Sequence, residues 1–294
     1  RVQGSVDGSD CRCDASSPMT STLLILGDSL MDAGNVSRAT DGLVLGEQIA
    51  IEMGSDPEYV QLFPLEDLPR PGSAQLHNYA HGGAQSGFGF KQQVRAVRRQ
   101  AEIYQSLHDV DLLISAGAND VLDQLEPGGA FMAVLETEDR RDDRRLMRRN
   151  AKQIARNLRR GVDRLTGLVD EVVVIGSFPL SSTPELQSMA AELDPGAFDR
   201  LIEIVDGIGA KVQRKLERHV ASDGSVVVLN LKAAWDRLEA PSFIDAVHPS
   251  SETNRQLAEL IVPDLIAELN SFGFAEGLRP MKGLRITRTL PIHS

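Results

Sequence analysis

The chain has 294 residues, of which 41% are hydrophobic and 25% are charged, a composition typical of a globular protein with a sizeable core. Its formal net charge of −11 argues against a broad nucleic-acid-binding surface, because the phosphate backbone would be repelled. No run of about 18 or more apolar residues occurs, so the sequence predicts no membrane-spanning helix.

The N-terminal segment differs in composition from the remainder of the chain. Residues 1–20 are rich in Gly, Ser and Asp, and we expect a disordered tail there, followed by one domain over residues 21–294. Both cysteines, Cys11 and Cys13, lie in this tail, so neither is expected to cross-link the core. A Cys-x-Cys pair alone supplies too few ligands for a metal site, and no metal is predicted.

The first predicted element is a buried strand that ends at a serine. Four apolar residues, 23–26, are followed by the turn-forming Gly27, Asp28 and Ser29. Open parallel sheets place their ligand chemistry at the carboxyl ends of the strands. Ser29 therefore stands where a nucleophile would stand, although a serine at a strand end often only caps the next helix.

A helix, a loop, a strand and a second helix are expected next along the chain. Apolar residues at positions 45, 49, 50 and 53 predict a helix within residues 41–54. Residues 55–75 contain four prolines and are expected to form a loop. A short strand is expected within residues 76–84, and a helix with a basic surface is expected over residues 86–107.

The middle of the chain combines a buried strand with a long basic helix. Residues 111–116 predict a strand, and residues 121–137 predict a helix interrupted at 127–129. The following segment carries one apolar stripe, formed by Met147, Ala151, Ile154, Leu158, Val162, Leu165 and Val169. Eleven of the 31 Lys and Arg residues also lie there. We expect a helix that packs on a sheet and has a solvated arginine face, rather than a membrane- or nucleic-acid-binding helix.

The last third of the chain completes an alternation of strands and helices. Strands are predicted at residues 171–177 and 225–230, and a helix is predicted between them at 195–220. A final helix is expected over 250–269, capped by Ser250 or Ser251 and kinked or divided at Pro263. This alternation predicts a three-layer α/β/α fold around a mainly parallel sheet of about five strands.

Polar residues follow several predicted strands and together supply the groups that acyl transfer requires. These residues are Ser29, Gly82, Gly83, Asn119, Asp245 and His248. A serine hydroxyl needs a base, which a histidine provides, and a carboxylate orients that histidine. Backbone N–H groups and an amide side chain can stabilise the oxyanion. We expect the strand-end residues to meet at one sheet edge, and the loop around residue 248 to reach them.

The chain resembles the GDSL, or SGNH, family of esterases and lipases. The resemblance rests on four blocks: Gly27-Asp28-Ser29-Leu30, extended through Asp32-Ala33-Gly34-Asn35; Asn78-Tyr79-Ala80-His81-Gly82-Gly83-Ala84; Gly117-Ala118-Asn119-Asp120; and Asp245-Ala246-Val247-His248-Pro249. Its longer first two blocks are most similar to the branch that contains plant GDSL lipases and bacterial secreted acylhydrolases. From that branch alone, a secreted or periplasmic location is favoured over a cytoplasmic one.

The resemblance implies a flavodoxin-like fold and the hydrolysis of carboxylic esters without metal or cofactor. It implies Ser29 as nucleophile and first oxyanion donor, His248 as base and Asp245 as its orienter. Asn119 would be the side-chain donor, and Gly83 is favoured over Gly82 as the glycine donor. Asp28, His81 and Gly82 are further residues expected near the pocket. His81 departs from the small or apolar residue common in the family, and we expect a satisfied histidine near the pocket.

Other functions fit the sequence less well than ester hydrolysis or remain as alternatives to it. An α/β-hydrolase is disfavoured because position 31 is Met31 rather than the glycine of its nucleophile motif. Residues 82–89 are glycine-rich but fit neither nucleotide-binding pattern, and His77 with His81 lacks a third metal ligand. A carbohydrate O-deacetylase with the same residues remains the main alternative, and a non-catalytic binding protein on the same fold is a further one. The substrate is expected to be a small-molecule ester of short to medium acyl length, while the oligomeric state stays open.

Overall fold

The computed structural model describes residues 22–53, 60–62, 76–104, 110–126, 128–137, 139–176, 178–220 and 226–271. The expected tail, residues 1–20, and both cysteines lie outside these ranges. Among the described residues, no helix combines the length and apolar character needed to cross a bilayer.

The described part of the chain is built around a six-stranded sheet in which every neighbouring pair is parallel. The strands are β1 (Thr22–Gly27), β2 (Val60–Leu62), β3 (Leu76–Asn78), β4 (Val110–Ser115), β5 (Glu171–Ile175) and β6 (Val226–Leu229). Their order across the sheet is β2-β3-β1-β4-β5-β6. Without β2, this is the flavodoxin-like order, which confirms the predicted fold class.

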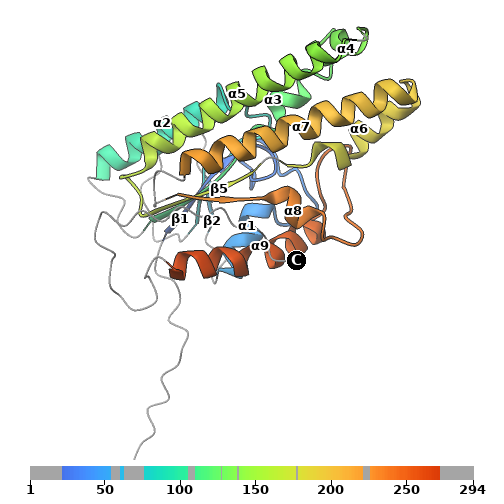
Figure 1. The fold of residues 1–294 in the computed structure, drawn as a ribbon. Coiled ribbons are helices and arrows are strands. Elements are labelled where there is room, and N and C mark those ends of the chain that lie inside the picture. Colours follow the sequence, from blue (N-terminus) through green and yellow to red (C-terminus); the bar gives the residue numbers. More distant parts are fainter. Residues whose placement is uncertain are drawn as a thin grey trace, which may run out of the picture.

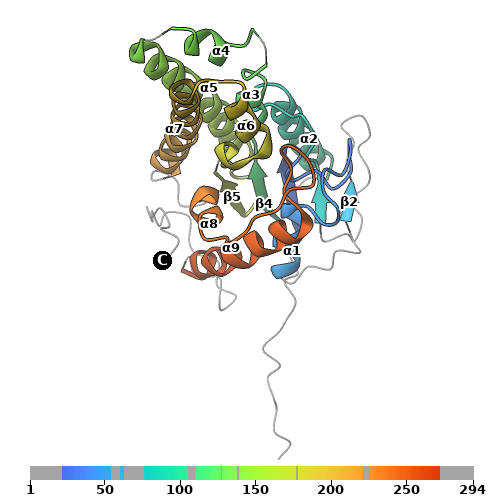
Figure 2. The ribbon, with the colours of Figure 1, turned by 90° about the vertical axis from the view of Figure 1, so that its right-hand side faces the viewer.

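Helices cover both faces of this sheet (Figures 1 and 2). One layer contains α2 (Gly89–Tyr104), α5 (Arg140–Leu165) and α7 (Pro195–Val220). The opposite layer contains α1 (Leu45–Glu52), α8 (Leu231–Trp235) and α9 (Ser251–Ser271). Because both faces are covered, every residue of β5 and β6 is buried, including Glu171 at the start of β5, and the apolar runs that follow predict this burial.

Several short helical elements occur along the chain between the longer helices and the strands. They are α3 (Asn119–Leu122), α4 (Ala130–Leu135), α6 (Pro184–Ser188) and the 3₁₀ turns η2 (Leu180–Ser182) and η3 (Met189–Ala191). The gap between α3 and α4 matches the predicted interruption, whereas α6 and α8 were not anticipated. Helices of five residues carry too few repeats for a periodic signal to be visible in sequence.

The structure corrects the sequence expectations at three places. Val60–Leu62 is a strand within the segment expected as loop, because it pairs with β3 and becomes an edge strand, which raises the strand number to six. The helix α5 ends before Val169, since Gly167 adopts a left-handed φ of 90° that stops helices. The helix α9 is not divided at Pro263, because this residue lies on the exposed side, where the freed carbonyl can bond to water.

Candidate active site

The turn after β1 is held by close backbone packing. A Cβ atom on Gly27 would lie 2.2 Å from the Ser115 carbonyl oxygen on β4, so only glycine fits this position. The buried amide of Gln93 on α2 donates to the Gly27 carbonyl at 2.7 Å and accepts its N–H at 2.8 Å. These contacts fix the point at which the chain leaves the sheet, and Ser29 follows two residues later.

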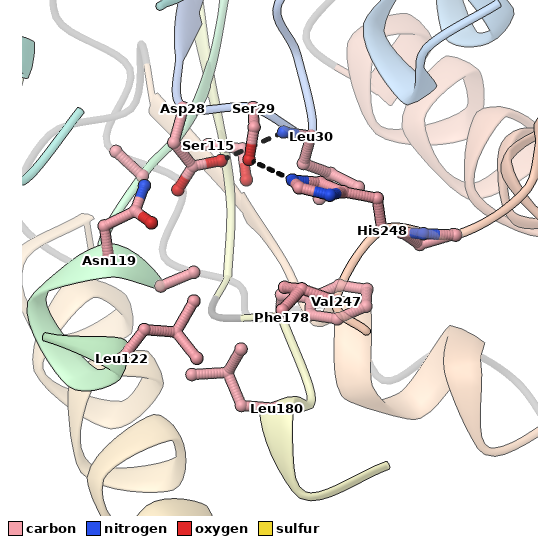
Figure 3. A pocket seen from close by; sticks show the side chains of 13 residues that line it. Asp28, Ser29, Leu30, Ser115, Asn119, Leu122, Phe178, Leu180, Val247 and His248 are labelled. Carbon is pink, nitrogen blue, oxygen red and sulfur yellow. Dashed lines mark hydrogen bonds between the residues drawn. The ribbon is translucent and has the colours of Figure 1, made fainter. Parts of the chain in front are cut away.

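Ser29, His248 and Asp245 form a continuous chain of contacts, although the serine is 219 residues from the histidine. His248 Nε2 lies 2.8 Å from Ser29 Oγ, and His248 Nδ1 lies 2.7 Å from Asp245 Oδ2 (Figure 3 draws the first contact). The serine hydroxyl is therefore hydrogen-bonded to a base that is itself bonded to a carboxyl group, the arrangement required for nucleophile activation.

The loop that carries Asp245 and His248 is closed by its own backbone. The Ile244 N–H donates to the His248 carbonyl at 2.9 Å, and the Ser250 N–H donates to the Ser242 carbonyl at 2.9 Å. Asp245 Oδ1 also accepts the N–H groups of Val247 and His248 at 2.8 and 2.7 Å. This folded loop presets the orientation of the histidine before any ligand arrives.

The two carboxyl groups nearest the serine have opposite pKa shifts. Partial burial opposes ionisation of Asp245, but the N–H groups of His248 and Val247 and the His248 ring outweigh it and lower its pKa. Burial raises the pKa of Asp28 to about 7, against hydrogen bonds from the backbone of Leu30 and Ala118. Asp245 is therefore ionised at neutral pH, whereas Asp28 is close to half-protonated.

Residues 81–84 form a turn that lies against the serine. A Cβ atom on Gly82 would lie 3.9 Å from the Cβ of Ser29. The Gly82 N–H already donates to Asp32 Oδ2 at 2.8 Å. Gly83 has a left-handed φ of 75°, and its N–H has no hydrogen-bond partner among the described residues. Of the two glycines, Gly83 therefore has the available donor.

The buried Asp32 holds this turn and its own loop together. Its carboxyl oxygens accept four backbone N–H groups, from Gly34 at 2.9 Å, Asn35 at 2.6 Å, Val36 at 3.1 Å and Gly82 at 2.8 Å. The loop after Ser29 and the turn that contains Gly83 are thereby joined through one side chain. The Asn35 amide adds a second link by donating to the carbonyls of Asn78 and Ala80, both at 2.8 Å.

Asn119 is the first residue of α3, which follows β4 in the chain, and its side chain faces the same site as Ser29. Its Nδ2 donates to the Ala84 carbonyl at 3.2 Å, which leaves the second amide hydrogen available. The neighbouring Asp120 accepts both the N–H and the hydroxyl of Ser86, at 2.7 and 2.8 Å. Figure 3 shows Asn119 and His248 on opposite sides of Ser29.

A small cavity of about 20 Å³ opens beside Ser29. The polar side chains along it are those of Asp28, Ser29, Ser115, Asn119 and His248. Its apolar lining comes from Leu30, Leu122, Phe178, Leu180 and Val247, together with Ala116, Ala118 and Pro249 (Figure 3). This volume is close to the minimum needed for a single water molecule.

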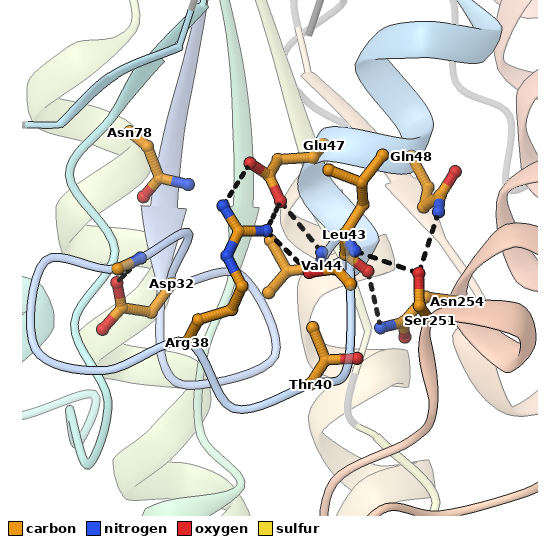
Figure 4. Close-up of polar contacts among 12 residues, drawn as sticks. Asp32, Arg38, Thr40, Leu43, Val44, Glu47, Gln48, Asn78, Ser251 and Asn254 are labelled. Carbon is orange, nitrogen blue, oxygen red and sulfur yellow. Dashed lines mark hydrogen bonds and ion pairs between the residues drawn. The ribbon is translucent and has the colours of Figure 1, made fainter. Parts of the chain in front are cut away.

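The segment after His248 is anchored to the loop that follows Ser29 (Figure 4). Ser251 Oγ accepts the Leu43 N–H at 2.9 Å, and the Ser251 N–H donates to Asp41 Oδ1 at 2.7 Å. The hydrogen bond from Ser251 lowers the pKa of Asp41. Ser250 Oγ accepts the Thr253 N–H at 3.2 Å, so it is the residue that caps α9.

Some of the predicted site residues line the cavity, and others lie outside it. Ser29, Asp28, Asn119 and His248 line the cavity, and Asp245 stands behind the histidine. Gly82, Gly83 and His81 do not line the cavity, and His81 Nδ1 lies 3.0 Å from the Tyr79 carbonyl oxygen. Among the described residues, no three His, Cys, Asp or Glu side chains gather as a metal ion would require.

Sequence reasoning missed the apolar wall and the role of Asp32. Phe178 and Leu180 follow β5, so the rule that sites form at strand ends was a usable signal for them. Leu122 had no such signal, because its position depends on the short helix α3. Asp32 belongs to the first of the four family blocks, but its contact with the Gly82 N–H forms only in the folded chain.

Comparison with known proteins gives the following matches. A family model described as GDSL-like Lipase/Acylhydrolase matches residues 23–261. Curated protein sequences gave no match. Among solved structures, a member of the lipolytic protein G-D-S-L family from Veillonella parvula is 13% identical, with a TM-score of 0.45, over 81% of this chain and 94% of that one. An acetylxylan esterase from Geobacillus stearothermophilus is 18% identical, with a TM-score of 0.44, over 87% and 97%.

Proposed function

The chain belongs to the GDSL-like lipase/acylhydrolase family and is a carboxylic ester hydrolase, and we propose that Ser29, His248 and Asp245 carry out its reaction through an acyl-enzyme. The observation that carries this proposal is the contact chain, 2.8 Å from Ser29 Oγ to His248 Nε2 and 2.7 Å from His248 Nδ1 to Asp245 Oδ2. Its three groups have the chemical types and the order that serine hydrolysis needs.

In the first half of the reaction, Ser29 Oγ attacks the ester carbonyl carbon while its proton passes to His248 Nε2. The Nδ1–H tautomer of His248 is favoured because Asp245 accepts that proton in a hydrogen bond. The imidazolium then gives its proton to the leaving alcohol as the tetrahedral intermediate collapses. In the second half, His248 takes a proton from water, and the resulting attack releases the acid and restores the serine.

The oxyanion is stabilised in this mechanism by three donors: the backbone N–H groups of Ser29 and Gly83, and the side-chain amide of Asn119. Gly83 is preferred to Gly82 because the Gly82 N–H is already bonded to Asp32. Preorganised donors are effective because they need no rearrangement as the charge develops, and loss of one typically costs about 10²–10³ in rate.

The small cavity beside Ser29 favours a short acyl group. Leu122, Phe178 and Leu180 lie along this cavity, where they would contact the methyl of an acetyl ester. Acetyl esters of small alcohols or of carbohydrates are thus the proposed substrates. The carbohydrate O-deacetylase remains the second candidate, since the same cavity would hold its acetyl group.

The first prediction concerns the nucleophile. The variant Ser29→Ala should lose hydrolysis of p-nitrophenyl acetate and p-nitrophenyl butyrate to the background rate, with an unchanged melting temperature. The matched variant Ser188→Ala removes an exposed serine hydroxyl that, within the described part of the chain, bonds only to the Glu185 carbonyl, and it should retain full activity. Activity of Ser29→Ala near that of the parent protein would refute the mechanism.

The second prediction concerns acyl length. Rates over p-nitrophenyl esters from acetate to palmitate should fall steeply beyond butyrate, and acetylated xylan should be tested alongside. Leu122→Ala removes a half-buried side chain from the cavity wall, so the butyrate-to-acetate ratio should rise about three- to tenfold, a difference of about 1 kcal/mol. An unchanged ratio in Leu122→Ala would show that another surface limits the acyl group, whereas a strong preference for xylan acetate would select the deacetylase.

A further inference from the structure

The layer of α2, α5 and α7, here called the basic layer, carries a charge opposite to that of the remaining chain. It contains 20 of the 31 Lys and Arg residues but only 8 of the 42 Asp and Glu residues. Its formal charge is therefore +12, while the remaining residues carry −23. Because these helices lie side by side on one face of the sheet (Figures 1 and 2), the charge is concentrated on one side of the molecule.

Most cations of α5 have no ion-pair partner among the described residues, although Arg140 pairs with Asp143 and Glu203. Between Asp143 and Asp163, α5 has eight Lys and Arg residues and no acidic residue, and all eight side chains are exposed. Within the described ranges, none of these eight lies within 4.0 Å of a carboxylate. In contrast, Arg255 on α9 in the opposite layer pairs with Glu252 at 2.6 Å and also with Glu259.

This pattern weakens the helix instead of stabilising it. Lys152 and Arg156 are four residues apart, as are Arg156 and Arg160, so neighbours on the helix surface repel each other. A face that served only solubility would intersperse both signs of charge, as α9 does. An external anion that lies along α5 would relieve this repulsion.

A pocket of about 130 Å³ lies between α2 and α5 and is surrounded by positive charge. The exposed cations Lys91, Arg160 and Arg164 line it together with the buried apolar side chains of Phe90 and Val94. A more open groove of about 620 Å³ between α5 and α7 is lined by Lys152, Arg156, Arg159, Lys215, Arg218 and His219.

The sequence alone favours a solvated arginine face on α5. From the charge distribution and this pocket we propose instead that the basic layer binds an anionic phospholipid bilayer, with a phosphate headgroup seated among Lys91, Arg160 and Arg164. The pocket offers three cations to one phosphate group, and the exposed ring of Phe88, directly before α2, favours an amphiphilic anion over a purely polar one. The three helices form a layer that is broad in both views (Figures 1 and 2). A broad layer suits the surface of a bilayer better than a single nucleic-acid strand.

The distribution of aromatic residues distinguishes a bilayer from a single-stranded nucleic acid. The helix α5 contains no aromatic residue, so it offers no platform on which bases could stack. Phe88 is 70% exposed directly before α2, three residues from Lys91. An exposed aromatic ring next to cations is the combination that membrane interfaces favour.

The test is co-flotation of the full chain with lipid vesicles. The parent protein should float with vesicles that contain phosphatidylglycerol, should not float with pure phosphatidylcholine, and should be released as salt rises. Each Lys or Arg near such a surface contributes about fivefold to partitioning, so Lys91→Gln/Arg160→Gln/Arg164→Gln should lose at least about tenfold. The charge-matched variant Lys232→Gln/Arg237→Gln/Arg255→Gln, in the α8–α9 region, should change partitioning by less than about twofold.

Three results would overturn the proposal. They are failure of the parent protein to bind anionic vesicles at low salt, equal losses in the two triple variants, and binding to duplex or single-stranded DNA under conditions where vesicles do not bind. The Ser29→Ala variant should float like the parent protein, because vesicle binding does not require ester hydrolysis. The result is therefore independent of the proposed reaction.

Discussion

Asp32 is the single residue on which the geometry of the proposed oxyanion site most depends. It is fully buried, and it accepts backbone N–H groups from both the loop after Ser29 and the turn that contains Gly83. It touches neither the cavity nor the Ser29–His248 contact, so it acts through Gly82. Its proposed part in the reaction is to position the Gly83 donor against the nucleophile.

Asp32→Asn should lower kcat about ten- to a hundredfold with little change in KM. The asparagine amide cannot accept the N–H groups of Val36 and Gly82 while its oxygen holds those of Gly34 and Asn35, so the turn should shift away from the serine. Steady-state kinetics on p-nitrophenyl acetate with a parallel melting curve would measure this. Asp236→Asn, which alters an exposed carboxylate paired with Lys232, is the control, and an equal loss there would contradict the positioning role.

At the level of elements, the histidine is placed by the joint between α9 and the loop before α1. Thr40 donates to the Pro249 carbonyl at 3.3 Å, and Asn254 donates to the Leu43 carbonyl at 3.3 Å. The loop is itself supported by Glu47, which accepts the Val44 N–H at 3.0 Å and pairs with Arg38 at 2.5 Å (Figure 4). The beginning of α9 is therefore fixed to the loop that follows the nucleophile, and His248 lies just before it.

Ser251→Ala should weaken this joint. It removes the acceptor of the Leu43 N–H, so we expect a loss of about 1 kcal/mol in unfolding free energy and a fall of about 2–4 °C in melting temperature. Because His248 is three residues away, kcat should also fall several-fold. Ser188→Ala again serves as the exposed-serine control, and a kcat unchanged in Ser251→Ala would show that the loop around His248 holds itself in place.

For the whole molecule, two buried carboxyl groups with strongly raised pKa values should make stability depend on pH. Burial raises the pKa of Asp28 from 3.8 to about 7, and burial followed by the nearby Asp111 raises that of Glu171 from 4.5 to about 8. Both groups hold their protons more tightly in the folded chain than in the unfolded one, so folding takes up protons between these values. Their contribution to unfolding free energy therefore falls as the pH rises from about 4 to about 8.

The melting temperature should accordingly be higher at pH 5 than at pH 8. Each pKa unit corresponds to about 1.4 kcal/mol of unfolding free energy, so the two groups together should change it by several kcal/mol across this range. Asp28→Asn/Glu171→Gln should flatten the profile and raise the melting temperature at pH 8. The control Asp236→Asn/Glu239→Gln changes two exposed carboxylates. If melting temperature varies with pH in Asp28→Asn/Glu171→Gln as it does in this control, Asp28 and Glu171 are not the cause of the dependence.

The sequence alone was sufficient for those features that repeat locally. The apolar runs of β5 and β6 and the stripe on α5 predicted their elements because burial on a sheet imposes a period that a short window reveals. The helix α7 begins and ends where the pattern predicted, at Pro195 and Val220. The strand-end rule and the family resemblance together singled out Ser29, Asn119, Asp245 and His248 as candidate site residues.

Only the tertiary structure decided what depends on contacts between distant segments. Val60–Leu62 became a strand through pairing with β3, and Asp32 acquired its fourth donor through Gly82, 50 residues away. The same holds for the small cavity that Leu122 and Phe178 line, and for the pocket that α2 and α5 form together. Sequence periodicity records how one segment is buried, whereas the shape and charge of a site depend on which segments meet, and that is determined by the packing of the whole chain.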